Sequence, residues 1–268
     1  MDPHPAYAAA VHPARLDTAI HTDVQGLDTA EVRIPVRDGE LPAYQASPSG
    51  MLGAVPVVLV VEEIFGIHEY IRDVCRRLAK AGYFALAPDL FARQGDVLKM
   101  KDQQEILSQV VSRVPDEQVM ADLDEAAEYA ARTGKADLAR FGLTGFCWGG
   151  RIAWLYAAHS NRLRAAVAWY GRLIHPVSKL QPRTPVDVAP ELKCPVLGLY
   201  GEADPAIPLE HVESMRQAIR AASKNASLMV YPGAGHGFHA DYRATYHKDA
   251  ATDGWLRLRE WFREYGVA

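Results

Sequence analysis

Apolar positions along the chain follow two spacings, one typical of strands and the other of helices. Residues 31–46 alternate apolar and polar on both sides of Asp38-Gly39, which predicts a β-hairpin. Val55–Val61 is an unbroken apolar, β-branched run, typical of a strand buried on both faces of a parallel sheet. Helical spacing follows over 68–81, and Gly82 ends that predicted helix.

The same alternation continues to the C-terminus. We predict strands over 83–87, 141–144, 165–170, 196–200 and 226–231, and helices over 116–133, 149–159, 209–222 and 246–263. Repeated strand-then-helix units predict an α/β fold, with a mostly parallel central sheet and helices on both faces. Four prolines in 173–192 predict a surface loop. The start of the chain lacks periodicity, so we predict an N-terminal arm over 1–30 and one domain over 31–268.

Composition narrows the class of partner. Apolar residues make up 49% of the 268 positions, as in an ordinary soluble globular protein, and the net charge of −4 gives no basic stripe for nucleic acid. The longest apolar run, 54–61, is far shorter than the roughly 20 residues of a membrane span, and we see no secretory signal. The three cysteines form neither a disulfide framework nor a zinc spacing, so we predict a reducing cytoplasm. Oligomeric state stays open.

The sharpest motif is Gly145-Phe146-Cys147-Trp148-Gly149-Gly150, between a predicted strand and a predicted helix. It has the form of the G-x-S-x-G nucleophile elbow with cysteine in place of serine. The glycines are needed because a Cβ would strike the neighbouring strand or helix, and the amides that begin the helix favour a thiolate. A lone cysteine is more often buried and structural, as we expect for Cys75 and Cys194. The elbow context instead predicts that Cys147 is a nucleophile.

A nucleophilic thiol needs a base, and the base needs an orienting group. Asp204 follows the predicted strand 196–200, and His236 follows the predicted strand 226–231. Both therefore belong to the sheet edge where α/β proteins place their sites, in the chain order nucleophile, acid, histidine. Taken singly, an aspartate before proline is usually a turn residue and a histidine between glycines a loop residue. Together with Cys147 they predict a catalytic triad.

With these motifs the chain resembles the dienelactone hydrolase family of the α/β-hydrolase fold. The resemblance covers about 31–263 and also involves two further segments, Glu62-Glu63-Ile64-Phe65-Gly66 and Pro88-Asp89-Leu90-Phe91-Ala92-Arg93. It implies a hydrolase that uses Cys147, Asp204 and His236 as its triad, and neither a cofactor nor a metal ion is expected.

The resemblance also implies roles for four more residues. Glu63 would face the resting thiol, the backbone amides of Ile64 and Trp148 would form the oxyanion hole, and Arg93 would bind a substrate carboxylate. A shielded glutamate beside a thiol would have a raised pKa, although Glu62 and Glu63 both remain candidates for the inward-pointing residue. A guanidinium fork suits a carboxylate, while the alternative for Arg93 is a solvated charge.

One departure bears on the substrate. Lactone-specific members of the family carry a second arginine at the position of Ala240; His239 or Arg243 could take its place, and Tyr170 could line the pocket. We therefore predict hydrolysis of a small-molecule lactone or small carboxylic ester. The alternatives are a general carboxylesterase or thioesterase, and a non-catalytic relative whose thiol senses oxidants.

Overall fold

Eight strands form a single sheet in the part of the chain that the computed structural model describes, residues 7–12 and 14–268. The strands are β1 (Leu27–Val36), β2 (Gly39–Pro48), β3 (Val55–Val61), β4 (Phe84–Pro88), β5 (Ala136–Phe146), β6 (Ala165–Trp169), β7 (Val196–Gly201) and β8 (Ala226–Tyr231). Their order is β1-β2-β4-β3-β5-β6-β7-β8, and β2 runs antiparallel to both of its neighbours while the other pairs are parallel. The predicted mostly parallel α/β-hydrolase fold is confirmed.

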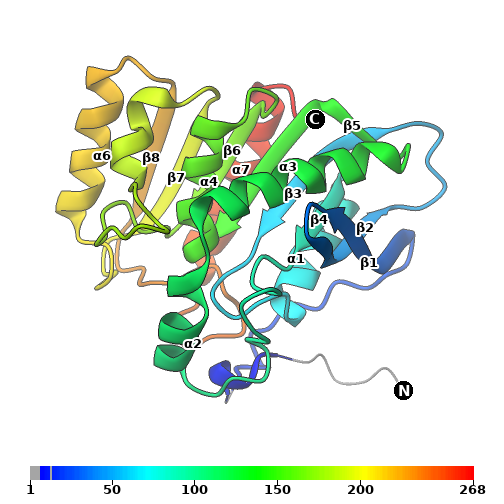
Figure 1. Cartoon of the computed structure of the whole chain (residues 1–268), viewed down its shortest axis with the longest axis horizontal. Coiled ribbons are helices and arrows are strands. Elements are labelled where there is room, and N and C mark those ends of the chain that lie inside the picture. The colour runs from blue at the N-terminus through cyan, green and yellow to red at the C-terminus, as the bar shows by residue number, and fades with distance from the viewer. Residues whose placement is uncertain (1–6, 13) are drawn as a thin grey trace.

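Helices cover both faces of this sheet. They are α1 (Glu69–Lys80), α2 (Gln103–Gln109), α3 (Asp116–Arg132), α4 (Trp148–His159), α5 (Pro185–Val188), α6 (Leu209–Ala221) and α7 (Lys248–Glu264), with short 3-10 turns η1 (Ala9–Val11), η2 (Val111–Arg113) and η3 (Ala189–Glu191). In Figure 1, α3 and α4 lie in front of the sheet and α7 lies behind it. Among the described residues, none of these helices combines the length and the apolarity that a membrane span requires.

The predicted elements match the observed ones closely, with three differences. β3 and β8 have the predicted bounds, but β5 starts at Ala136, because the register between β3 and β5 shifts at Pro56/Val57 and the longer strand stays paired. The predicted loop 173–192 contains α5 and η3. Helix α2 was not predicted, although Asp102 caps it by accepting hydrogen bonds from the amides of Gln104 and Glu105.

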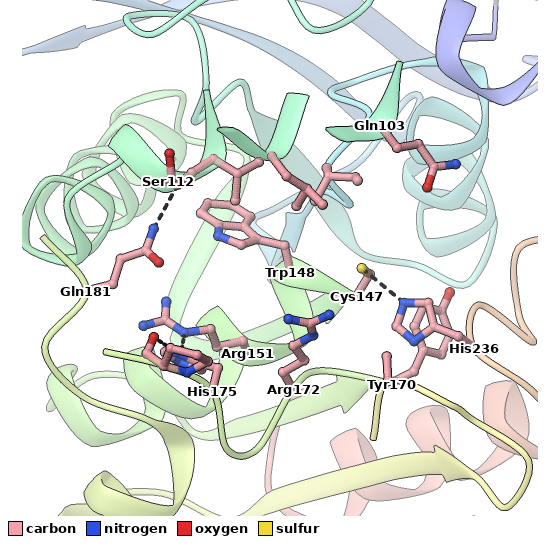
Figure 2. A pocket seen from close by; sticks show the side chains of 15 residues that line it. Gln103, Ser112, Cys147, Trp148, Arg151, Tyr170, Arg172, His175, Gln181 and His236 are labelled. Carbon is pink, nitrogen blue, oxygen red and sulfur yellow. Dashed lines mark hydrogen bonds between the residues drawn. The ribbon is translucent and has the colours of Figure 1, made fainter. Parts of the chain in front are cut away.

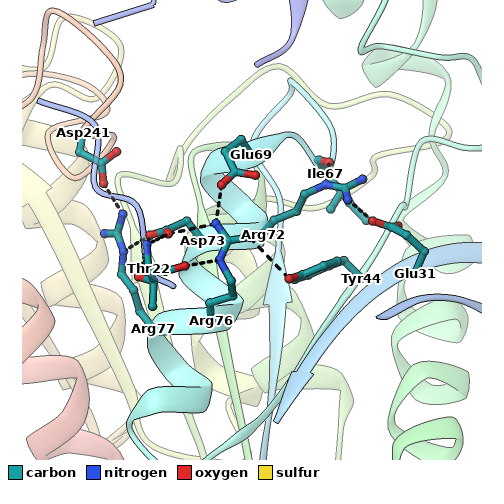
Figure 3. A network of polar contacts seen from close by, with 10 residues as sticks. All are labelled: Thr22, Glu31, Tyr44, Ile67, Glu69, Arg72, Asp73, Arg76, Arg77 and Asp241. Atoms are coloured by element: carbon teal, nitrogen blue, oxygen red, sulfur yellow. Dashed lines mark hydrogen bonds and ion pairs between the residues drawn. The ribbon is translucent and has the colours of Figure 1, made fainter. Parts of the chain in front are cut away.

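The described part of the N-terminal arm lies across the body of the domain. Asp73 of α1 accepts a hydrogen bond from the amide of Thr22 (2.6 Å), and Arg76 donates to the carbonyl of Thr22 (2.9 Å), as Figure 3 shows. The ring of Tyr7 stacks on that of Tyr242, with 5.1 Å between centroids. Because β1 begins at Leu27, the last four residues of the predicted arm belong to the sheet; its first six residues and residue 13 lie outside the described residues. The boundary at residue 30 stays a prediction.

Candidate active site

Three loops meet at the carboxyl edge of the sheet and bring Cys147, Asp204 and His236 together. Cys147 follows β5, Asp204 follows β7 and His236 follows β8. The Nε2 atom of His236 lies 3.2 Å from the sulfur of Cys147, and its Nδ1 atom lies 2.7 Å from Oδ2 of Asp204. Figure 2 shows the thiol and the imidazole facing each other in one cavity. The three residues thus have the spacing of a nucleophile, a base and an orienting acid.

Backbone strain at the elbow explains why its glycines are needed. Cys147 has φ 54° and ψ −112°, a left-handed conformation that a non-glycine residue adopts only where its surroundings enforce it. A Cβ on Gly145 would lie 2.0 Å from the carbonyl oxygen of Gly149, and one on Gly149 would lie 2.4 Å from the carbonyl oxygen of Val61. The backbones of β5, α4 and β3 are therefore in direct contact at this turn, and only glycine fits there.

The charge state of His236 depends on both of its neighbours. Burial lowers the pKa of the imidazole. The charge of Cys147 and the hydrogen bond to Asp204 outweigh that effect and raise the pKa to about 10. Asp204 is itself buried and also accepts a hydrogen bond from the amide of Ala206 (2.8 Å), so its second oxygen stays aimed at His236. The imidazole is consequently protonated at neutral pH. A positively charged imidazolium is the partner that stabilises a thiolate.

The other two cysteines lie in different surroundings. Cys75 and Cys194 are buried, and burial raises the pKa of each thiol to about 12. Both are therefore protonated and shielded from reagents at neutral pH, as expected for structural cysteines. Cys147, by contrast, is partly exposed and lines the cavity.

Two backbone amides lie beside Cys147. Ile64 follows β3 and Trp148 begins α4, and both residues line the same cavity as Cys147. The amide of Gly149 donates to the carbonyl of Glu62 (3.1 Å), which ties the end of β3 to the start of α4. Within the described part of the chain, neither the Ile64 nor the Trp148 amide donates a hydrogen bond. Both are thus available to a carbonyl oxygen of a bound molecule, as the family resemblance implies for an oxyanion hole.

The cavity above Cys147 has a volume of about 360 Å³, at the lower end of the range for small-molecule sites. Leu107 of α2 and Val111 of η2 form an apolar wall together with Trp148. Tyr170 also lines the cavity, in agreement with its predicted position, and its ring meets that of His236 edge to face at 5.4 Å. The space therefore suits a small, partly apolar molecule.

Both glutamates at the end of β3 are buried, so neither is a surface acid. Tyr242 donates a hydrogen bond to Oε2 of Glu63 (2.7 Å), and Arg243 lies 3.8 Å from Oε1. Glu62 accepts a hydrogen bond from the amide of Leu90 (2.9 Å), and burial together with the charge of Asp89 raises its pKa well above the usual range. Glu63 is thus shielded as expected, but its hydrogen bond goes to Tyr242 rather than to the thiol of Cys147.

The expectation for Arg93 is corrected by its contacts. Its guanidinium makes hydrogen bonds of 2.7–3.0 Å to Asp38, in the hairpin turn, and to Asp122 of α3. Arg93 is not among the residues that line the cavity of Cys147. Because two carboxylates already occupy the guanidinium, this residue ties the hairpin to α3 and does not face a ligand in that cavity.

His239 is likewise placed elsewhere. Its ring is buried between Trp169 and Trp255, at 4.4 and 5.7 Å between centroids, and its Nδ1 atom lies 2.7 Å from the hydroxyl of Tyr70. It lines a separate crevice with Arg77 rather than the cavity of Cys147. Ala240 is fully buried. The predicted substrate-binding role of His239 is therefore corrected, because aromatic packing holds the ring away from the cavity of Cys147.

Sequence reasoning missed the basic residues that do line the cavity. Arg151 of α4 and Arg172, two residues after Tyr170, both contribute to its wall, together with His175. One signal for Arg172 was present in the sequence: it follows the predicted strand 165–170, and β6 pairs with β5, the strand that leads to Cys147. Arg151 carried no separate signal, since an arginine in a helix is ordinarily a solvated charge.

A cysteine elbow, an aspartate and a histidine at the strand ends of this sheet define an α/β hydrolase. The model of the dienelactone hydrolase family matches residues 41–266. The chain belongs to the dienelactone hydrolase family and is a hydrolase of carboxylic ester bonds.

Named relatives and a solved structure agree with this membership. The chain is 60% identical to a Methylorubrum extorquens protein over 98% of this chain and 90% of that protein, and 53% identical to one from Yersinia pestis over 94% and 96%; both carry the name "Putative carboxymethylenebutenolidase". A crystal structure from Klebsiella pneumoniae, described as a "Putative Dienelactone Hydrolase", shares 54% identity with a TM-score of 0.88, covering 89% of this chain and 99% of that one.

Proposed function

We propose that this hydrolase cleaves a lactone or a small carboxylic ester, with Cys147 as the nucleophile and a thiol acyl-enzyme as the intermediate. The observation that carries the proposal is the alignment of Cys147, His236 and Asp204, at 3.2 and 2.7 Å, in a cavity of small-molecule size. Membership of the dienelactone hydrolase family supports it. We also propose the reducing cytoplasm as its location, since a catalytic thiol must stay reduced.

In the first half-reaction the Cys147 sulfur attacks the carbonyl carbon, so that a C–S bond forms and the carbonyl oxygen becomes negative. The amides of Ile64 and Trp148 donate hydrogen bonds to that oxygen, and each such donor is worth on the order of 3 kcal/mol. The intermediate then collapses, the C–O bond breaks, and protonated His236 gives its proton to the leaving oxygen. In a lactone the alcohol or enol so formed stays attached to the acyl chain.

In the second half-reaction water releases the acid. Neutral His236, still oriented by Asp204, removes a proton from water as the oxygen attacks the thioester carbon. The C–S bond breaks, Cys147 leaves as a thiolate and His236 is protonated again. Glu63 enters as a positioning residue, because it holds Tyr242 and faces Arg243 next to the loop that carries His236.

A second candidate function is that of a general carboxylesterase or thioesterase. It is favoured by the engagement of Arg93 with Asp38 and Asp122, and by the buried Ala240, since neither residue can bind a lactone carboxylate in this cavity. Under this alternative, neutral esters and thioesters would be turned over at least as fast as lactones.

Steady-state kinetics with the purified full chain separates these functions. We expect turnover of an enol lactone and of 4-nitrophenyl acetate, with the lactone preferred by about tenfold in kcat/KM over a thioester of equal acyl length. The enol released from the lactone tautomerises to the more stable ketone and so leaves the reverse reaction, whereas a released thiol can attack the acyl-enzyme again. A preference for the thioester would favour the second candidate. No turnover of any of them, combined with rapid alkylation of Cys147 by iodoacetamide, would contradict both and favour a non-catalytic thiol sensor.

A further inference from the structure

The backbone beside His236 has little conformational restraint of its own. Residues 232–247 connect β8 to α7, and we name this segment the histidine loop. His236 stands between Gly235 and Gly237, and Gly237 has φ 74°, in the left-handed region that favours glycine. Because glycine adopts many backbone conformations, contacts further along the loop are needed to keep the imidazole in one place.

The N-terminal arm supplies such contacts a few residues after His236. The amide of Arg15 donates a hydrogen bond to the carbonyl of Tyr242 (2.7 Å), and the hydroxyl of Thr18 donates one to the carbonyl of Asp241 (2.5 Å). The buried ring of Tyr7 stacks on the ring of Tyr242, with 5.1 Å between centroids. The arm therefore holds a segment that lies more than 220 residues further along the chain, since Thr18 and Asp241 are 223 positions apart.

The arm and the histidine loop are attached to the same helix, α1. Arg77 of α1 forms ion pairs with Asp241 of the loop and with Asp73 of its own helix. Asp73 in turn accepts a hydrogen bond from the amide of Thr22 in the arm (2.6 Å), and Figure 3 shows these residues side by side. Asp73 and Asp241 are both buried. The arm, α1 and the loop are thus joined by polar groups that water does not reach freely.

The part of the loop that the arm holds is in contact with the residue next to His236. Tyr242 donates a hydrogen bond to Glu63 (2.7 Å), and the neighbouring Arg243 lies 3.8 Å from the same carboxylate. The guanidinium of Arg243 also packs against Gly237, because a Cβ on Gly237 would lie 2.9 Å from its Nη1 atom. A shift of Tyr242 and Arg243 would therefore reach Gly237, and with it the backbone of His236.

We propose that Tyr7 and Thr18 are positioning residues of the reaction, because the arm holds the histidine loop so that His236 keeps its place between Cys147 and Asp204. This inference rests on the proposed function, in which His236 transfers the proton. An imidazole that moves away from the sulfur stabilises the thiolate less and meets the leaving oxygen less well. A misplacement of about 1 Å can lower a rate by up to about a hundredfold.

The first test measures the pairing of thiol and imidazole without requiring hydrolysis. The rate of alkylation of Cys147 by iodoacetamide is measured against pH, and peptide mapping assigns the modified cysteine. In Thr18→Val the rise of the rate should move to higher pH by about half a unit, and in the double variant Thr18→Val/Tyr7→Leu by about one unit, because the thiolate loses part of its imidazolium partner. Thr18→Ser keeps the hydroxyl and should restore the wild-type profile.

Thr133→Val is the matched control for the loss of a threonine hydroxyl. Thr133 donates a hydrogen bond of similar length (2.6 Å) to the carbonyl of Ala130 at the end of α3, so its replacement should leave the alkylation profile unchanged. Thermal unfolding is recorded for every variant. An arm that only stabilises the fold would lower the unfolding temperature and leave the profile in place. A wild-type profile in the double variant overturns the proposal, whatever its unfolding temperature.

The second test asks whether the arm matters for turnover. Thr18→Val should lower kcat/KM for 4-nitrophenyl acetate about fivefold, and Thr18→Ser should return it to within about twofold of the wild-type value. A shifted alkylation profile with unchanged kcat/KM would overturn the positioning role in the reaction. If the wild-type chain hydrolyses no ester, the proposed function fails, and the alkylation profile still shows whether the arm places His236 against Cys147.

Discussion

Replacing Cys147 by alanine is expected to lower kcat/KM for a lactone or a 4-nitrophenyl ester by at least about a thousandfold. In the proposed reaction the sulfur forms the covalent bond, and His236 faces it at 3.2 Å in the cavity. Removing the sulfur would leave substrate binding and the oxyanion donors but no nucleophile. The alanine side chain fits the same strained elbow, so the fold should be retained. Steady-state kinetics and a thermal unfolding curve measure the two effects separately.

The matched control is Cys194→Ala. Cys194 is buried before β7, away from the cavity, so this variant should keep kcat/KM within about twofold. A Cys147→Ala protein that unfolds like the wild type and still turns over the ester would refute the assignment of the nucleophile. Loss of turnover in both variants would point to a general effect of removing a thiol.

Asp204→Asn is expected to lower kcat/KM by about a thousandfold and to move its alkaline limb to lower pH. The hydrogen bond to Asp204 is one of the causes that raise the pKa of His236 to about 10. Without the carboxylate that pKa falls, and the imidazolium that protonates the leaving oxygen is lost earlier as the pH rises. The wild-type rate should hold to about pH 9, whereas the variant should decline at a lower pH.

Rates measured from pH 6 to pH 10.5 test this expectation, with Glu202→Gln as the control. Glu202 lies in the same loop and accepts a hydrogen bond from the amide of Gly233 (3.0 Å), which a glutamine oxygen can also accept. Its replacement should leave the alkaline limb in place. An Asp204→Asn profile that superimposes on the wild-type profile would show that the carboxylate does not control His236.

Local patterns were enough to predict the sheet and to place Cys147, Asp204 and His236 together at one edge of it. The glycines around Cys147 are required by close backbone contacts, and such constraints appear directly in a sequence. The apolar run of β3 and the helical spacing of α1 are equally local signals. Helix α2 is short and mostly polar, with only Ile106 buried, so its apolar periodicity was too weak to detect.

Side-chain partners were beyond the reach of the sequence. Arg93 follows the expected strand, but Asp38 and Asp122 come from a hairpin turn and from α3, and their ion pairs decide where its guanidinium lies. The same holds for Glu62 and Glu63. The sequence left open which of the two points inward, and both are buried.

Trapping the covalent intermediate shows whether Cys147 is the nucleophile. The wild-type chain is mixed with a 4-nitrophenyl ester or a lactone, quenched in acid within milliseconds to seconds, and measured by intact-protein and peptide mass spectrometry, with Cys147→Ala treated in parallel. We expect an added mass equal to the acyl group, or to the whole lactone, located on Cys147 and absent from the variant. Acylation of another residue, or turnover without any adduct on Cys147 under conditions where acylation outpaces hydrolysis, would contradict it.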